Sequence, residues 1–343
     1  MRVTTTDDVL DLMDDCFTSA ALVTALELGL FWLLEKGPVD DKTIAETFEI
    51  PINRCRYWLQ LLNAAGFIEQ GSEGYTLPDS IRAAILDSFS RDTWGLLAKE
   101  ASDRFPGLCD LSLHINSIGS VWDVLGLTPS DYISNMTKDP QQARRFTHML
   151  YELHQSLAEV LARSLNMTGV KRLLDLGGGS GVISQALLCQ HPHLTAVVVD
   201  IPNVCAAGRV MAAGKSFEQR LTYHEADFLR DELPSGFDMV VECDVNVYNE
   251  SLFRRVWSAL KPEGRFIVVD QLAPAVGVAP ASRIHWAFQG SMIDPEFTFL
   301  TSPDIQTLMK KAGFRILSQQ PLPHSTERAE RFMKGMTLIE AQK

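Results

Sequence analysis

The sequence lacks the features that mark nucleic-acid-binding, secreted and membrane proteins. Lysine and arginine together number 31 against 43 aspartate and glutamate residues, and the formal net charge is −12. No basic surface is therefore expected to attract a phosphate backbone. No apolar run approaches the roughly 20 residues that span a bilayer, and residues 1–15 are acidic without an apolar core. These absences predict a cytoplasmic protein that binds neither nucleic acid nor membrane.

Cysteine is also scarce and scattered. The six cysteines form no Cys-x-x-Cys pair, which predicts reduced thiols rather than a disulfide framework or a zinc site. The eight histidines show no metal-ligand spacing on one helix, so no metal is expected. With 46% hydrophobic and 22% charged residues in 343, the composition predicts a globular protein with a sizeable core and two domains or one large one.

The first third of the chain predicts helices followed by a hairpin. Apolar residues recur at helical spacing over residues 9–34, a second helix is expected at 53–65, and a turn at 71–74 leads into a short strand at 75–77. This order is typical of a winged helix. Because the surroundings are acidic, we favour a packing and dimerisation module over a DNA-binding one. Residues 141–165 predict one long helix.

An alternation of strands and helices begins after residue 165 and predicts a mostly parallel α/β sheet. The expected strands are residues 172–176, 195–199, 237–241 and 265–270, and a helix is expected at 182–189. The predicted division is a helical and winged-helix dimerisation domain at 1–100, a helical linker at 101–165, and a ligand-binding domain at 166–343.

A glycine-rich turn joins the first of these strands to its helix. It reads Asp175-Leu-Gly-Gly-Gly-Ser-Gly181, so glycine stands at 177, 178, 179 and 181. Acidic residues follow the next strands, Asp200 first and then Asp227, which precedes Phe228. A carboxylate at the end of the second strand of a βαβ unit accepts hydrogen bonds from ribose hydroxyls. The spacing departs from the Gly-x-Gly-x-x-Gly of NAD-binding domains and resembles the S-adenosylmethionine (SAM) site of class I methyltransferases.

Nearly the whole chain resembles the small-molecule O-methyltransferases of the caffeate, acetylserotonin and bacterial polyketide-tailoring type. The resemblance implies a Rossmann-like class I methyltransferase sheet, an N-terminal dimerisation domain, a homodimer, SAM as cofactor and a small-molecule acceptor. It implies that the glycines hold the methionine part of SAM, Asp200 the ribose, and Asp227 with Phe228 the adenine. Asp175 and Glu242 are assigned to the same cofactor site. Met149 falls near the family's acceptor pocket, to which the linker is expected to contribute, and Glu340 falls near its catalytic base.

The departure from the family lies after the fourth strand. The family has a His-Asp-Trp-x-Asp-Glu run there, whose histidine takes the proton of the acceptor hydroxyl. This chain has Cys243-Asp-Val-Asn-Val-Tyr-Asn-Glu250 instead, with no histidine between His224 and His285. Counting along the strand puts Val247 or Glu242 at the base position. Phe299 stands where the family has a glutamate.

The missing base favours a sulfur acceptor, because the lone pair of a thioether attacks without losing a proton. We therefore expect methylation of a thioether or thiol, for example a methylthio-hydroxy acid on a route to dimethylsulfoniopropionate. Aromatic faces stabilise the sulfonium product, and an arginine holds a carboxylate through paired bonds. The residues assigned to catalysis are Tyr248, Asn246, Asp244 and His285, and those assigned to the acceptor are Met149, Arg283, Trp286 and Phe288.

Three alternatives remain. The first is an O-methyltransferase of a phenol or enol, with Asp244, Glu242 or His285 as base or with an acceptor that binds already ionised. The second is a hydroxylase or cyclase that uses the charge of bound SAM without methyl transfer. The third is a DNA-binding regulator built on the winged helix.

Overall fold

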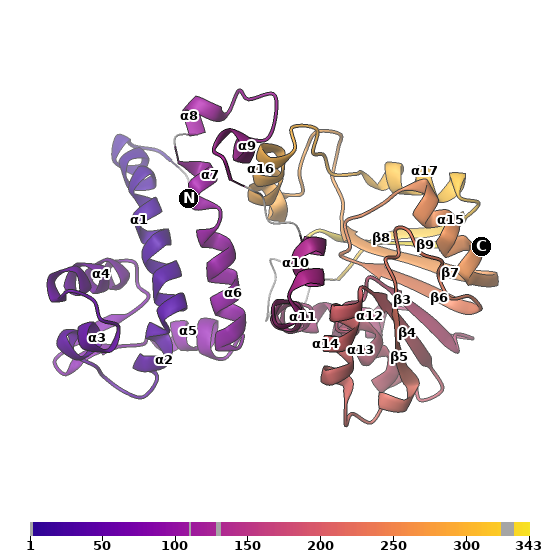
Figure 1. Cartoon of the computed structure of the whole chain (residues 1–343), viewed down its shortest axis with the longest axis horizontal. Coiled ribbons are helices and arrows are strands. Elements are labelled where there is room, and N and C mark those ends of the chain that lie inside the picture. The colour runs from indigo at the N-terminus through magenta and orange to yellow at the C-terminus, as the bar shows by residue number, and fades with distance from the viewer. Residues whose placement is uncertain (1–2, 110, 128–131, 324–332) are drawn as a thin grey trace. The chain divides into compact units, whose positions relative to one another are not determined.

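The computed structural model describes residues 3–109, 111–127, 132–323 and 333–343 (Figure 1). The chain divides into two compact units, residues 1–109 and residues 110–343. The second unit contains the whole large sheet together with the helices that precede it.

The first unit is helical apart from one hairpin. Its elements are α1 (Thr6–Leu28), α2 (Leu30–Leu34), α3 (Asp41–Thr47), α4 (Ile52–Ala64), β1 (Glu69–Gly71), β2 (Gly74–Thr76), α5 (Asp79–Ile81), a short π-helix (Arg82–Leu86), α6 (Arg91–Ser102) and α7 (Phe105–Leu108). The Asp40 carboxylate caps α3 by accepting from the N–H groups of Lys42 and Thr43. The order α3, α4, hairpin confirms the predicted winged helix. The helix predicted over residues 9–34 is divided at Gly29.

The second unit is built on a sheet of seven strands in the order β5-β4-β3-β6-β7-β9-β8 (Figure 1). The strands are β3 (Arg172–Leu176), β4 (Thr195–Asp200), β5 (Leu221–Glu225), β6 (Phe237–Cys243), β7 (Leu260–Gln271), β8 (Arg315–Pro321) and β9 (Met336–Gln342). The first five in this order pair in parallel, and β9 lies antiparallel between β7 and β8. The order reverses between β3 and β6, and α/β sheets bind ligands beyond the carboxyl ends of the strands at such a point.

The helices of this unit are α8 (Leu111–His114), α9 (Val121–Val124), α10 (Tyr132–Lys138), α11 (Pro140–Leu153), α12 (Gln155–Ser164), α13 (Val182–Gln190), α14 (Pro202–Ala212), α15 (Glu250–Ala259), a 3₁₀ turn (Ala281–Arg283), α16 (Ile284–Ile293) and α17 (Ser302–Lys311). Some of them cover the two faces of the sheet. Successive residues of β3 point to opposite faces: Leu173 packs with α12 and α13, and Leu174 packs with α15 and α17. Packing on both faces holds the strands in place, and with them the carboxyl ends of the strands, where the polar residues lie.

The single helix predicted over residues 141–165 is wrong. The structure ends α11 at Leu153 and begins α12 at Gln155, with His154 between them at φ −98° and ψ 6°. The ring Nδ1 of His154 lies 2.8 Å from the carbonyl oxygen of Leu150. At this break the imidazole points towards the end of strand β6. The apolar pattern of residues 141–165 continues through the break and therefore does not reveal it.

Candidate active site

The glycine-rich turn after β3 folds tightly around a buried acid. Gly177, Gly179 and Gly181 have positive φ values of 65°, 57° and 76°, which favour glycine. A Cβ at Gly178 would lie 2.5 Å from Cγ of Asp175. Asp175 is 1% exposed and accepts a hydrogen bond of 2.7 Å from the hydroxyl of Ser184 on α13. The backbone of this turn therefore lies bare, as close approach to a ligand requires.

Asp200 ends the neighbouring strand β4 and points back at the same turn. Its carboxylate accepts from the N–H of Gly179 at 2.9 Å and from that of Ile201 at 2.8 Å. Burial raises the pKa of Asp200 to about 6, and burial does the same to Asp175. Both groups are therefore mainly ionised at neutral pH and protonate in weak acid.

Two more of the predicted cofactor residues follow strand β5. The Asp227 carboxylate accepts from the N–H of Leu229 at 3.0 Å. The ring of Phe228 comes within 3.3 Å of the Cβ position at Gly177, and a methyl group of Val245 comes within 3.0 Å of the same point. Glycine at 177 thus allows Phe228 and Val245 to pack closely against the backbone of the turn. How each residue contacts the cofactor stays a prediction.

A second polar cluster lies at the carboxyl ends of β6 and β7 and is centred on Asp244. One of its carboxylate oxygens lies 3.0 Å from Nε2 of His154, and the other accepts from Nη2 of Arg283. Nε of Arg283 also donates to the side chain of Gln271 at 2.6 Å. Three segments far apart in the sequence thereby converge on one carboxylate.

His154 and Asp244 form an ion pair. Burial disfavours the charged imidazole, but the hydrogen bond and charge of Asp244 outweigh burial and raise the pKa of His154. Burial acts against the Asp244 carboxylate too, yet His154 and Arg283 lower its pKa. Because the carbonyl of Leu150 and the ionised carboxylate of Asp244 can only accept, the imidazole donates from Nδ1 to the first and from Nε2 to the second. The sequence analysis did not identify His154 as a site residue. The one indication in the sequence was its position, five residues after Met149, which was assigned to the acceptor pocket.

Beside this cluster lie two further acids. The hydroxyl of Tyr248 donates to Oδ2 of Asp270, whose Oδ1 accepts from the N–H of Gln271 at 2.6 Å. Burial, and next the charge of Asp244, raise the pKa of Asp270 to about 6. Glu242 is fully buried on β6, and neither of its oxygens has a hydrogen-bond partner among the described residues. Burial, and next the charge of Asp270, raise the pKa of Glu242 well above its ordinary value.

The remaining predicted residues lie in different surroundings. Asn246 donates to the backbone and side-chain oxygens of Asp244, and both residues hold left-handed backbones at φ 60° and 55°. Met149 is buried on α11. His285 and Phe288 are exposed on α16, so neither is enclosed in the cluster.

Aromatic rings adjoin the cluster through Arg283. Trp286 makes edge contacts with Phe297 and Phe299, each at 5.3 Å between ring centroids. The guanidinium of Arg283 lies 5.5 Å from the centroid of Trp286. Trp286 itself is 40% exposed, so this group of rings presents a flat aromatic face rather than a sealed core.

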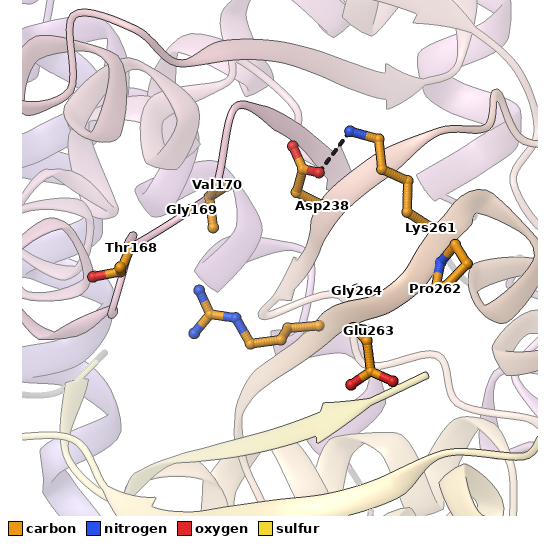
Figure 2. Close-up of a pocket in the computed structure, with 9 residues that line it drawn as sticks. Thr168, Gly169, Val170, Asp238, Lys261, Pro262, Glu263 and Gly264 are labelled. Carbon is orange, nitrogen blue, oxygen red and sulfur yellow. Dashed lines mark hydrogen bonds and ion pairs between the residues drawn. The ribbon is translucent and has the colours of Figure 1, made fainter.

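A separate small cavity of about 150 Å³ lies at the opposite edge of the sheet (Figure 2). Lys261 and Asp238 form an ion pair of 2.6 Å at its wall. These residues belong to the amino-terminal parts of β7 and β6, whereas Asp244 and Asp270 lie at the carboxyl ends. The cavity is therefore not part of the polar cluster described above.

Two features are absent from the described parts of the chain. No group of three or more histidine, cysteine, aspartate or glutamate side chains is arranged to hold a metal ion there. No helix in residues 3–109, 111–127, 132–323 and 333–343 has both the length and the apolar composition needed to cross a bilayer.

Comparison with known proteins gives consistent matches. The model of the O-methyltransferase domain family matches residues 122–315. The 3-hydroxy-5-methyl-1-naphthoate 3-O-methyltransferase of Streptomyces sahachiroi is 27% identical over 266 residues, 76% of each protein. The N,N-dimethyltransferase OxyT of Streptomyces rimosus is 26% identical over 303 residues, 86% of this chain and 87% of OxyT.

A solved structure shares the fold over the full length. The structure of PigF with S-adenosylhomocysteine (SAH) superposes with a TM-score of 0.80 at 20% identity and covers 99% of this chain and 100% of PigF. The seven-stranded sheet and the helical N-terminal unit thus recur together in a known protein.

Proposed function

The chain belongs to the O-methyltransferase domain family and is a SAM-dependent methyltransferase of small molecules, and from this premise we propose that it methylates an acidic hydroxyl of an aromatic acceptor. When bound, SAM supplies an activated methyl group carried on a sulfonium. The observation that carries the choice of oxygen is a cluster of ionisable groups at the ends of β6 and β7, in which the imidazole of His154 lies 3.0 Å from Asp244 and the hydroxyl of Tyr248 donates to Asp270.

The preference for a sulfur acceptor rested on the absence of an ionisable base at this sheet edge. No relative described above supports sulfur, since their names state transfer to oxygen or nitrogen. His154 and Arg283 place two cations beside the carboxylate of Asp244. A nearby cation favours the anionic form of a phenol or enol.

The flat face around Trp286 supports an aromatic acceptor. Edge-on contacts with Phe297 and Phe299 hold the Trp286 ring in place, and stacked or edge-on aromatic pairs contribute about 0.5–1.5 kcal/mol beyond area burial. The named naphthoate relative acts on a hydroxylated aromatic acid. We propose an acceptor of this chemical class, with the acidic hydroxyl directed towards β6.

We propose that the cofactor lies over the glycine turn, with Asp200 on the ribose and Phe228 with Asp227 on the adenine. The glycines at 177, 178 and 179 leave the backbone of the turn without side chains, which supports close approach of the cofactor. Asp200 is directed at the N–H of Gly179, the edge where ribose hydroxyls meet the second strand of such a unit. The linker predicted at 101–165 supplies His154 and Met149, which supports its proposed contribution to the acceptor pocket.

We also propose a homodimer in the cytoplasm. The N-terminal half of α1 exposes Leu10, Met13 and Phe17 at 53%, 69% and 66% of their surface. Exposed apolar patches of this kind mark protein–protein contacts. Sedimentation at micromolar concentration tests the assembly, and a monomer at all concentrations would contradict it.

The acceptor is tested with matched compounds. Purified enzyme and SAM are incubated with a hydroxynaphthoate and with its methylthio analogue, and SAH release and product mass are measured. We expect methyl transfer to the hydroxyl alone. Transfer to the thioether alone would overturn the proposal, and tight SAM binding without transfer to any acceptor would favour the hydroxylase or cyclase alternative.

A further inference from the structure

The geometry points to a proton route on strands β6 and β7: we propose that Tyr248 receives the acceptor's hydroxyl proton and delivers its own proton to Asp270. The inference rests on the proposed transfer to oxygen and assigns the base for it. Tyr248 is then a catalytic residue in contact with the acceptor, and Asp270 acts through Tyr248.

Asp270 is placed so that Tyr248 is its link to the site. Asp270 is 1% exposed, and its Oδ1 is occupied by the N–H of Gln271. Its Oδ2 accepts from the hydroxyl of Tyr248, a residue that is only half-buried. Because Tyr248 is more exposed than Asp270, the proposed route takes the acceptor's proton to the phenol oxygen first and then to the carboxylate.

The His154–Asp244 pair is the competing base, and its bonding argues against it. Both ring nitrogens of His154 already donate, to Leu150 and to Asp244. Both carboxylate oxygens of Asp244 face cations, and those cations lower the pKa of Asp244. A carboxylate with a lowered pKa is a weak base.

Asp270 has the opposite character. Its pKa of about 6 makes it a stronger base than an ordinary carboxylate, while most of it is ionised at pH 7. Burial raises the pKa of the neighbouring Glu242 well above its ordinary value, which favours its protonated form. Of these two acids, Asp270 is therefore the one that is free to gain a proton.

Tyr248 also lies on the segment that borders the cofactor turn. Val245, three residues before it, comes within 3.0 Å of the Cβ position at Gly177. Asp244, Tyr248 and Asp270 interact electrostatically, so the phenol oxygen lies in the same charged cluster. We place the acceptor oxygen between the glycine turn and this cluster, where it would face the donated methyl group.

The step balances in atoms and charge. The acceptor oxygen bonds to the methyl carbon as the bond between that carbon and sulfur breaks, and sulfur keeps the electron pair. The acceptor's proton moves to the oxygen of Tyr248, and the phenol proton moves to Oδ2 of Asp270. A sulfonium and a carboxylate become a neutral thioether and a neutral acid, and Asp270 later releases the proton to solvent.

The test compares Tyr248→Phe and Asp270→Asn with the control Tyr57→Phe, which removes the hydroxyl of a tyrosine that is 72% exposed on α4. Calorimetry with SAM confirms folding of each variant. For an acceptor whose phenol stays protonated at the assay pH, we expect kcat to fall about 10²–10⁴-fold in both site variants and to stay unchanged in the control. The wild-type rise of kcat through pH 6 should vanish in both.

A series of phenol acceptors with different pKa values separates catalysis from a structural role of Tyr248, because a purely structural role would not make the effect of Tyr248→Phe on kcat depend on the acceptor's pKa. Phenols that are already ionised need no base, so they should restore most of the rate in Tyr248→Phe. Wild-type kcat should depend only weakly on acceptor pKa, and a steep dependence would overturn the relay even if a variant fails to fold. If wild-type enzyme methylates no hydroxyl, the proposed function fails. If wild-type and Tyr248→Phe methylate hydroxyls with the same rate and pH profile, only the relay fails.

Discussion

The imidazole of His154 lies 3.0 Å from the carboxylate of Asp244, although 90 residues separate the two in the chain. The contact joins the break between α11 and α12 to the end of β6. Arg283 reaches the same carboxylate from the turn before α16. Asp244 is thus the point at which three segments of the acceptor side are fixed relative to one another.

Removal of the imidazole is expected to weaken this fixation. His154→Ala leaves Asp244 with Arg283 as its charged partner, and hydrogen bonds to charged groups are worth about 1.5–3 kcal/mol. We expect the free energy of unfolding at pH 6 to fall by about this amount. The exposed His285→Ala is the control and should change stability by less than about 0.5 kcal/mol.

The same pair predicts a pH dependence. The raised pKa of His154 means that its contribution is complete below its unfolded pKa and is lost as pH rises through the folded pKa. The difference between wild type and His154→Ala, measured by urea unfolding, should therefore shrink from pH 6 to pH 9. A difference that stays constant would show that the imidazole is not charged in the pair.

Gly178→Ala tests the close packing under the cofactor turn. The added methyl would lie 2.5 Å from Cγ of Asp175, which is buried and bonded to Ser184, so the turn must shift. A displacement of about 1 Å can cost about 100-fold in rate, and we expect a loss of turnover of this order. Gly95→Ala, on α6 with nothing near its Cβ position, should instead add roughly 0.5–1 kcal/mol of stability. Equal activity in both variants would contradict this view of the turn.

The affinity for SAM should fall in weak acid because Asp200 protonates. Burial raises the pKa of Asp200 to about 6, and the ionised carboxylate is the form that accepts two ribose hydroxyls. Calorimetry from pH 8 to pH 5 should show constant affinity above pH 7 and a decline below pH 6. Asp200→Asn should bind more weakly at pH 8 with a shallower pH dependence, since Asp175 still titrates. Equal wild-type affinity at pH 5 and pH 8 would rule out this role.

The sheet was predictable because its signals are local. The predicted strand at 172–176 is the observed β3, and the glycine and acid positions follow from the ends of short, continuous apolar runs. The winged helix was predictable for the same reason. Strand β7 begins earlier than predicted, at Leu260 rather than Arg265, because Leu260 pairs with Phe237 of β6.

The polar cluster was not predictable in the same way. His154 belongs to an apolar helical stretch, and nothing within that stretch indicates that its ring reaches strand β6. The contact depends on the turn between α11 and α12 and on the left-handed backbone of Asp244. Both are tertiary features. The residues that directly follow β6 in the sequence include no histidine, and the imidazole near the end of β6 comes instead from His154, after α11.

Glu242→Gln separates a structural from a cofactor-binding role for the buried acid on β6. Burial raises the pKa of Glu242 well above its ordinary value and so favours the protonated acid, which glutamine closely matches in shape and charge. Its raised pKa means that wild-type stability is greatest below the unfolded pKa and declines as pH rises towards the folded one. Thermal unfolding should therefore favour Glu242→Gln increasingly from pH 5 to pH 9, because glutamine does not titrate. Unchanged SAM affinity in this variant would remove Glu242 from the proposed cofactor contacts, whereas weaker binding would mean that SAM engages the carboxyl left without a partner.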